Sequence, residues 1–125
     1  MVVDEFLAVS PQLNEWFFKN LPWVMLGLGR EAEYLERAKK APSTPWLEAG
    51  MAVALRDFAA ASAIYERIGA KGNEAIARLH AAEDAAAAGR RSEADAELAK
   101  VQPFFEAEGA KPYLRRCETL LAAAS

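Results

Sequence analysis

Apolar residues recur every three or four positions through the second half of the chain, and this spacing limits the possible folds more than any other feature. One such stripe joins Phe58, Ala61, Tyr65 and Ile68. Further stripes are Ala75, Leu79, Ala82 and Ala86, then Ala94, Leu98, Val101 and Phe105, and finally Tyr113, Cys117 and Leu120. This spacing is typical of one face of an amphipathic helix, whereas a half-buried strand alternates. No segment of the sequence alternates for long, so we predict an all-α fold.

Residues that favour helix ends stand between these stripes. Ser and Thr before Pro favour a helix start, and glycine favours the left-handed conformation that ends a helix. The predicted starts are Ser10-Pro11, Thr44-Pro45, Asp57, Asn73 and Pro112, and the predicted ends are Gly29, Gly69, Gly89 and Gly109. Pro22 and Pro103 fall inside periodic segments, where proline removes a backbone hydrogen bond. They predict a break near Asn20 and a kink near Lys100.

Composition divides the chain near residue 48. Of the 28 alanines, 24 follow this point, whereas 7 of the 12 aromatic residues precede it. Alanine adds little apolar area but favours helices that approach closely. With 125 residues, we predict one helical-repeat domain, residues 1–125, with an aromatic-rich portion at 1–42 and repeated helix pairs at 43–125.

A segment of the chain recurs within that second portion. Residues 65–71, YERIGAK, are similar to residues 105–111, FEAEGAK, at an offset of 40 positions. Earlier in the same helices the offset is 33, which pairs Ala61 with Ala94. A repeat of this length made of two helices predicts an α-solenoid of antiparallel helix pairs in which the second copy has a longer helix.

The turn at residues 89–94, GRRSEA, resembles the turn between the two helices of a tetratricopeptide repeat. Residues 42–125 resemble the helical tail of large actinobacterial signalling proteins that combine an adenylate/guanylate cyclase-type module with an ATPase module; the segments that carry this resemblance are 44–49, 57–61, 68–70, 77–83, 104–105 and 109–110. The resemblance implies a right-handed, tetratricopeptide-like solenoid with a C-terminal capping helix. It also implies a protein or peptide partner at Trp46, Leu79 and Glu83, on the first helices of the pairs.

A dense aromatic cluster, Trp16, Phe17, Phe18 and Trp23, has two interpretations. It either packs in the core or forms an exposed interface patch. The first function that we expect is therefore a regulatory protein-interaction module of a bacterial signalling protein. The alternative is a small-ligand sensor with an apolar pocket in this aromatic region. An uncapped solenoid end would favour a homodimer.

Charge and residue counts argue against several other classes. The net charge is −3 and no basic face is visible, so we expect no nucleic-acid partner. No apolar run is long enough for a membrane span, and the single Cys117 excludes an internal disulfide, so we expect a cytoplasmic protein. The single His80 has Glu83 and Asp84 nearby, but a solvated helix face explains these residues better than a metal site. We expect no catalytic residues, no metal and no cofactor, and therefore no enzyme.

Overall fold

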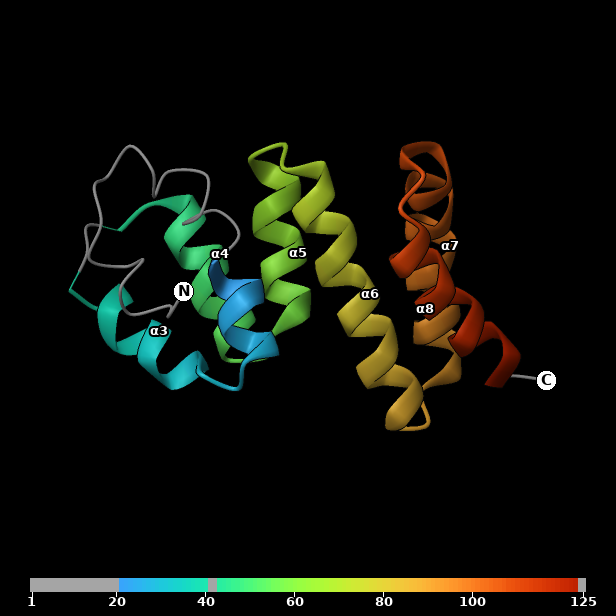
Figure 1. Ribbon diagram of the computed structural model, residues 1–125, viewed down its shortest axis with the longest axis horizontal. Coiled ribbons are helices and arrows are strands. Elements are labelled where there is room, and N and C mark those ends of the chain that lie inside the picture. The colour runs from blue at the N-terminus through green and yellow to red at the C-terminus, as the bar shows by residue number, and fades with distance from the viewer. Residues whose placement is uncertain (1–20, 41–42, 124–125) are drawn as a thin grey trace. The chain divides into compact units, whose positions relative to one another are not determined.

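The computed structural model describes residues 21–40 and 43–123, which form two compact units that meet between Asp57 and Phe58 (Figure 1). All regular secondary structure in these residues is helical, which confirms the all-α prediction. None of the helices in the two ranges is both long and apolar enough to cross a membrane. We call the parts on either side of this boundary the N-terminal unit and the C-terminal unit.

The N-terminal unit contains helical residues 21–27, helix α3 (Glu31–Ala38) and helix α4 (Pro45–Ala54). Thr44 caps α4, as predicted: its hydroxyl accepts a hydrogen bond of 3.1 Å from the Leu47 amide, and Pro45 occupies the first turn. The core of the unit consists of Leu21, Met25, Tyr34, Ala38 and Ala54, with Leu35, Leu47 and Met51 packed against it. Helix α4 therefore belongs to the same unit as α3.

Helices α3 and α4 approach closely at Gly50. A Cβ atom at this position would lie 2.0 Å from the Tyr34 hydroxyl oxygen and 2.7 Å from Cγ of Pro22. Such distances are far below van der Waals contact, so only glycine fits between the phenol ring and the proline. Tyr34 is 3% exposed, and burial raises its pKa to about 12 from the ordinary value of 10.0.

The raised pKa of Tyr34 predicts that the N-terminal unit loses stability in alkali. Between pH 10 and about 12 the unfolded chain releases the phenol proton while the folded chain keeps it, so the free energy of unfolding falls as pH rises. The expected slope is about 1.4 kcal/mol per pH unit, and the full contribution of Tyr34 is present below pH 10. Urea titrations at pH 8 to 11, followed by tryptophan fluorescence, measure it, because all three tryptophans precede residue 57. A Tyr34→Phe variant with the same slope as the parent would contradict this assignment.

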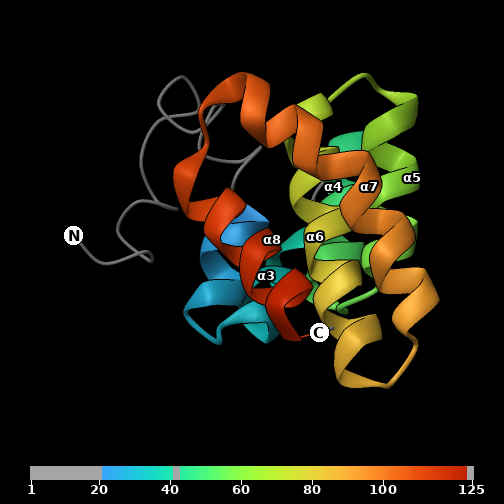
Figure 2. The ribbon, with the colours of Figure 1, turned by 90° about the vertical axis from the view of Figure 1, so that its right-hand side faces the viewer.

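The C-terminal unit contains four helices joined by short turns. They are α5 (Phe58–Arg67), α6 (Lys71–Ala87), α7 (Arg91–Glu108) and α8 (Lys111–Ala123). Each helix packs against the next one in the chain, and α6 also contacts α8 (Figures 1 and 2). The core lies between α6, α7 and α8 and consists of Ala75, Leu79, Ala82, Leu98, Val101, Phe105 and Cys117. All seven of these residues belong to the predicted stripes.

Three turns of the C-terminal unit have the same geometry. Gly69, Gly89 and Gly109 adopt positive φ angles of 75°, 79° and 66°. In each turn the amide of the residue after the glycine donates a hydrogen bond to the carbonyl five residues earlier: Ala70 to Tyr65 at 2.9 Å, Arg90 to Ala85 at 2.8 Å and Ala110 to Phe105 at 3.0 Å. This is the Schellman arrangement, which satisfies carbonyls that the helix leaves unpaired. The predicted glycine caps are confirmed.

Two local predictions for this unit need correction or refinement. Asn73 does not cap α6, because the helix begins at Lys71 and Ala70 occupies the cap position without a side-chain hydrogen bond. The Gly69 turn starts the helix earlier than the capping preference of asparagine suggested. Helix α7 contains Pro103 yet continues to Glu108. Val101 and Phe105 on either side of Pro103 are buried, and their packing offsets the lost hydrogen bond. The predicted break near Asn20 lies outside the described residues.

Candidate functional site

Helices α6 and α8 together carry a mixed aromatic and charged surface. His80 and Glu83 lie three residues apart on α6, and Tyr113 and Arg116 have the same spacing on α8, so each pair shares one side of its helix. The four side chains are partly buried. We call these four residues the α6–α8 surface.

A bidentate ion pair connects the two helices at this surface. Arg116 donates from Nε to Oε2 of Glu83 at 3.0 Å and from a terminal nitrogen to Oε1 at 2.5 Å. The side chains are 36% and 31% exposed, so solvent screens the pair only in part. The hydrogen bonds to Glu83 raise the pKa of Arg116 against the opposing effect of burial. The forked geometry fixes the direction of the guanidinium as well as its charge.

Aromatic rings extend this arrangement on both sides. The His80 ring stacks on Phe58 with centroids 4.7 Å apart, and its Nε2 lies 3.5 Å from a terminal nitrogen of Arg116. The Arg116 guanidinium lies 5.7 Å from the centroid of Tyr113, which stacks on Phe105 at 5.0 Å. Stacked rings next to a guanidinium are a rigid arrangement of the type that anchors protein interfaces.

The residues around this surface include the only cysteine of the sequence, Cys117. Within residues 21–40 and 43–123, no three His, Cys, Asp or Glu side chains are arranged to hold a metal ion. The Cys117 thiol is fully buried next to Arg116. Burial raises the pKa of this thiol, and the nearby Arg116 lowers it less, so the thiol stays protonated at neutral pH. A protonated, buried thiol is a core group and not a nucleophile.

The burial of Cys117 predicts slow reaction with thiol reagents. In the native protein, labelling by an aromatic disulfide reagent requires opening of the C-terminal unit, so we expect a rate at least about 100-fold below that of the unfolded chain. Absorbance of the released thiolate measures the rate, with and without urea. Because Cys117 is the only cysteine, the signal needs no correction for other sites. Native labelling at the rate of a free thiol would show that Cys117 is accessible.

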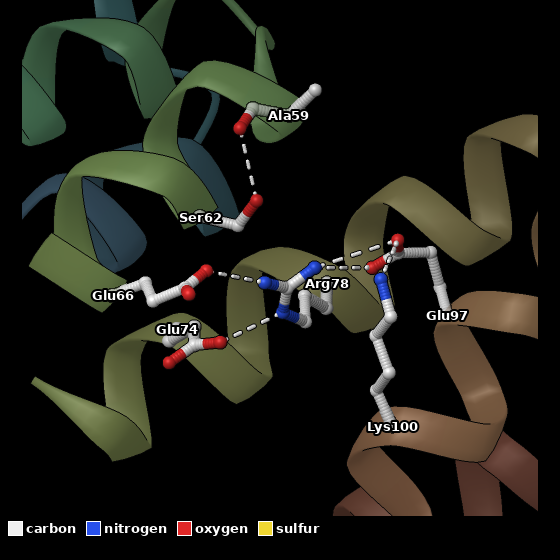
Figure 3. Close-up of polar contacts among 7 residues, drawn as sticks. All are labelled: Ala59, Ser62, Glu66, Glu74, Arg78, Glu97 and Lys100. Carbon is white, nitrogen blue, oxygen red and sulfur yellow. Dashed lines mark hydrogen bonds and ion pairs between the residues drawn. The ribbon is translucent and has the colours of Figure 1, made fainter.

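A second polar cluster connects three helices around Arg78 of α6 (Figure 3). Arg78 donates to Glu74 at 2.8 Å, to Glu97 of α7 at 3.2 Å and to Glu66 of α5 at 2.9 Å. Lys100 lies 3.6 Å from Glu97 at the edge of the cluster. The Arg78 side chain is 14% exposed. Burial acts to lower the pKa of Arg78, but the hydrogen bonds and charges of Glu74 and Glu97 outweigh it and raise the pKa. Because Arg78 binds carboxylates of α5, α6 and α7, the cluster links these helices.

Removing the charge of Arg78 is expected to destabilise the C-terminal unit. In Arg78→Met the three carboxylates lose their shared cation, and we expect a loss of about 2 kcal/mol in the free energy of unfolding, since Glu74 and Glu97 are largely buried. Urea denaturation followed by circular dichroism measures this change. Lys100→Met is the matched control and should cost less than about 0.5 kcal/mol, because its side chain is 57% exposed. Equal losses in the two variants would contradict the central role of Arg78.

The structure places the predicted partner-contact residues in different environments. Glu83 is partly exposed and belongs to the α6–α8 surface. Leu79 is fully buried in the core, so it has no surface to offer a partner, and the sequence prediction for it is corrected. Trp46 and Trp23 are partly buried in the N-terminal unit. Trp16, Phe17 and Phe18 lie outside the described residues, so their role stays a prediction.

The sequence did not predict that Arg116 and Tyr113 contribute to the α6–α8 surface. In the sequence Arg116 follows Arg115 and stands near Glu118, a mixture of charges that is typical of a solvated helix. One feature of the sequence could have indicated this role. Arg116 follows Glu83 by 33 residues, which is also the shorter repeat offset. Opposite charges one repeat apart fall on neighbouring helices of a stack.

The N-terminal unit also has an open depression beside α3. Its lining consists of Ala32, Glu33, Glu36, Arg37 and Lys40. Four of its five lining residues are charged and both signs are present, so this depression differs from the aromatic pocket expected for a small ligand. The prediction of such a pocket concerned the aromatic residues before it, most of which lie outside the described range.

Comparison with protein-family models, with curated proteins and with solved structures returned no match for this chain. The resemblance to signalling proteins with a helical-repeat tail therefore stays a prediction from the residues.

Proposed function

We propose that this chain is a protein-interaction module of the helical-repeat type, with tetratricopeptide-like packing and a regulatory role in a bacterial signalling protein of the cytoplasm. One observation supports the proposal: helices of the C-terminal unit begin again at intervals close to the predicted repeat length. Helix α7 begins at Arg91, 33 positions after α5 begins at Phe58, and α8 begins at Lys111, 40 positions after α6 begins at Lys71. Helices that recur at such intervals are typical of solenoids, whose extended surfaces recognise other proteins.

The contact between α6 and α8 supports this function. Helices α6 and α8 are separated in the chain by α7, yet they contact each other through Glu83 and Arg116. Their exposed sides therefore form one continuous surface. By the resemblance, the first helices of the pairs line the binding face. Helix α6 would be the first helix of the pair α6–α7, and α8 would be the capping helix that follows this pair. The α6–α8 surface is then the partner-binding site, and Trp46 of α4 is a further candidate contact.

The experiment that tests this function compares binding to two variants. Glu83→Ala/Arg116→Ala removes both charges of the ion pair, so neither remains unpaired at a partly buried position. We expect a protein captured by the parent chain to bind this variant at least about tenfold more weakly, a loss of about 1.4 kcal/mol, as measured by calorimetry with the purified partner.

The control variant for this binding experiment is Lys100→Ala, on α7 in the Arg78 cluster. It should bind the same partner with unchanged affinity. The proposal fails if no protein binds the parent chain specifically, or if every bound protein tolerates loss of the ion pair.

A further inference from the structure

Helix α8 has an apolar side that the rest of the C-terminal unit covers only in part. Cys117 at the centre of this side is fully buried, whereas Leu114 is partly buried and Leu121 is 39% exposed. Leu114 and Leu121 are seven residues apart, so they lie on one line along the helix, two turns from each other. This line is the exposed edge of the apolar side.

Charged residues of opposite sign border the same edge. Arg115 and Glu118 are both exposed and lie three residues apart, next to Leu114 and Leu121 respectively. This edge has a leucine near each end, a cation towards one end and an anion towards the other. It is therefore complementary to an antiparallel copy of itself. In an antiparallel pair of helices, Arg115 of each copy faces Glu118 of the other. In a parallel pair each charged residue would face the same residue of the other copy, so like charges would repel.

We propose that α8 pairs antiparallel with α8 of a second copy of this chain, about a two-fold axis near residues 117 and 118. Leu114 then packs against Leu121 of the partner subunit, and Arg115 lies opposite Glu118 of the partner subunit. The two-fold axis repeats each contact, so the interface holds two leucine contacts and two ion pairs. Such a self-complementary patch is the requirement for a closed dimer. This inference does not depend on the function proposed above.

The interface is small, because each copy contributes one face of one helix. Interfaces below about 1,200 Å² belong to weak, reversible complexes, so we expect a dissociation constant on the order of 100 µM. The dimer then forms at high local concentration, for example when two copies are held close together.

Sedimentation equilibrium from about 10 µM to 1 mM protein tests the dimer. The parent chain should change from monomer to dimer across this range. Leu121→Glu places a carboxylate at each leucine contact and should weaken the dimer at least about 100-fold. Leu55→Glu is the matched control: Leu55 is 65% exposed and belongs to the N-terminal unit, so the dissociation constant should not change. Circular dichroism and the labelling rate of Cys117 verify that each variant is folded.

Charge reversal tests the antiparallel register directly. Arg115→Glu alone and Glu118→Arg alone each place like charges opposite one another, and each should dimerise about tenfold more weakly than the parent. An equimolar mixture of the two variants should form a heterodimer with the parent affinity, because every reversed charge then faces its opposite. A chain that stays monomeric at 1 mM, a dimer unaffected by Leu121→Glu, or a mixture that associates no better than its components would overturn the proposal.

Discussion

Replacing Leu79 with alanine is expected to lower the free energy of unfolding of the C-terminal unit by about 3 kcal/mol. Leu79 of α6 is fully buried and belongs to the same core cluster as Leu98 and Phe105 of α7. Truncating a buried leucine removes its transfer free energy and leaves a cavity that close-packed neighbours fill only in part. Urea denaturation followed by circular dichroism measures the loss, and the labelling rate of Cys117 gives a second value for the same unit.

Leu121→Ala is the control for this substitution. The same atoms are removed, but the side chain is 39% exposed, so the monomer should lose less than about 1 kcal/mol when measured at low concentration. If Leu79→Ala costs no more than Leu121→Ala, Leu79 is not the core residue that the structure indicates. The comparison thereby also decides between a core and a surface role for Leu79.

Replacing Gly50 with alanine is expected to destabilise the N-terminal unit by about 2 to 3 kcal/mol. In an exposed helix the same change would stabilise by up to about 1 kcal/mol, because glycine is a poor helix former. Here the added methyl group overlaps the Tyr34 hydroxyl and the ring of Pro22, both of which are buried. Overpacking of this kind outweighs the gain in helix propensity. Tryptophan fluorescence in urea measures the change, because it reports only on residues before 57.

A second substitution identifies the cause of the Gly50→Ala effect. Tyr34→Phe removes the oxygen that a Cβ at residue 50 would approach to 2.0 Å. The double variant Tyr34→Phe/Gly50→Ala should therefore recover part of the loss, although the contact with Pro22 remains. Effects that simply add would exclude the hydroxyl as the source of the clash.

Helix positions and ends in the C-terminal unit were largely predictable from the sequence. The stripe Ala94, Leu98, Val101 and Phe105 is buried throughout, because period and packing agree there. Glycine at residues 69, 89 and 109 marks turns for a local steric reason that needs no knowledge of the tertiary structure. Asn73 failed as a start signal because a side-chain preference competes with a turn that already begins the helix.

The domain boundary and the polar surface were less predictable. Composition placed α4 with the alanine-rich helices, but Leu47 and Met51 pack against the core that contains Tyr34. Which helix covers which depends on contacts between distant residues, and composition does not record these. For the same reason Leu79 and Glu83, four residues apart on one helix, could not be separated into a core residue and a surface residue. The partner of Glu83 stands 33 residues away on another helix.

The two repeat offsets of 33 and 40 differ by seven residues, and this difference bears on how the chain can change its length. Tyr65 of α5 has two counterparts in α7, Leu98 at the shorter offset and Phe105 at the longer one, and both are buried. Seven residues make nearly two full turns of a helix, so the longer copy returns to the same face. Insertions and deletions of about seven residues within these helices therefore preserve the core, whereas changes of one or two residues rotate the buried stripe into solvent. Evolution of such a chain, or its redesign, is free to alter helix length in steps of two turns while every glycine turn stays the same.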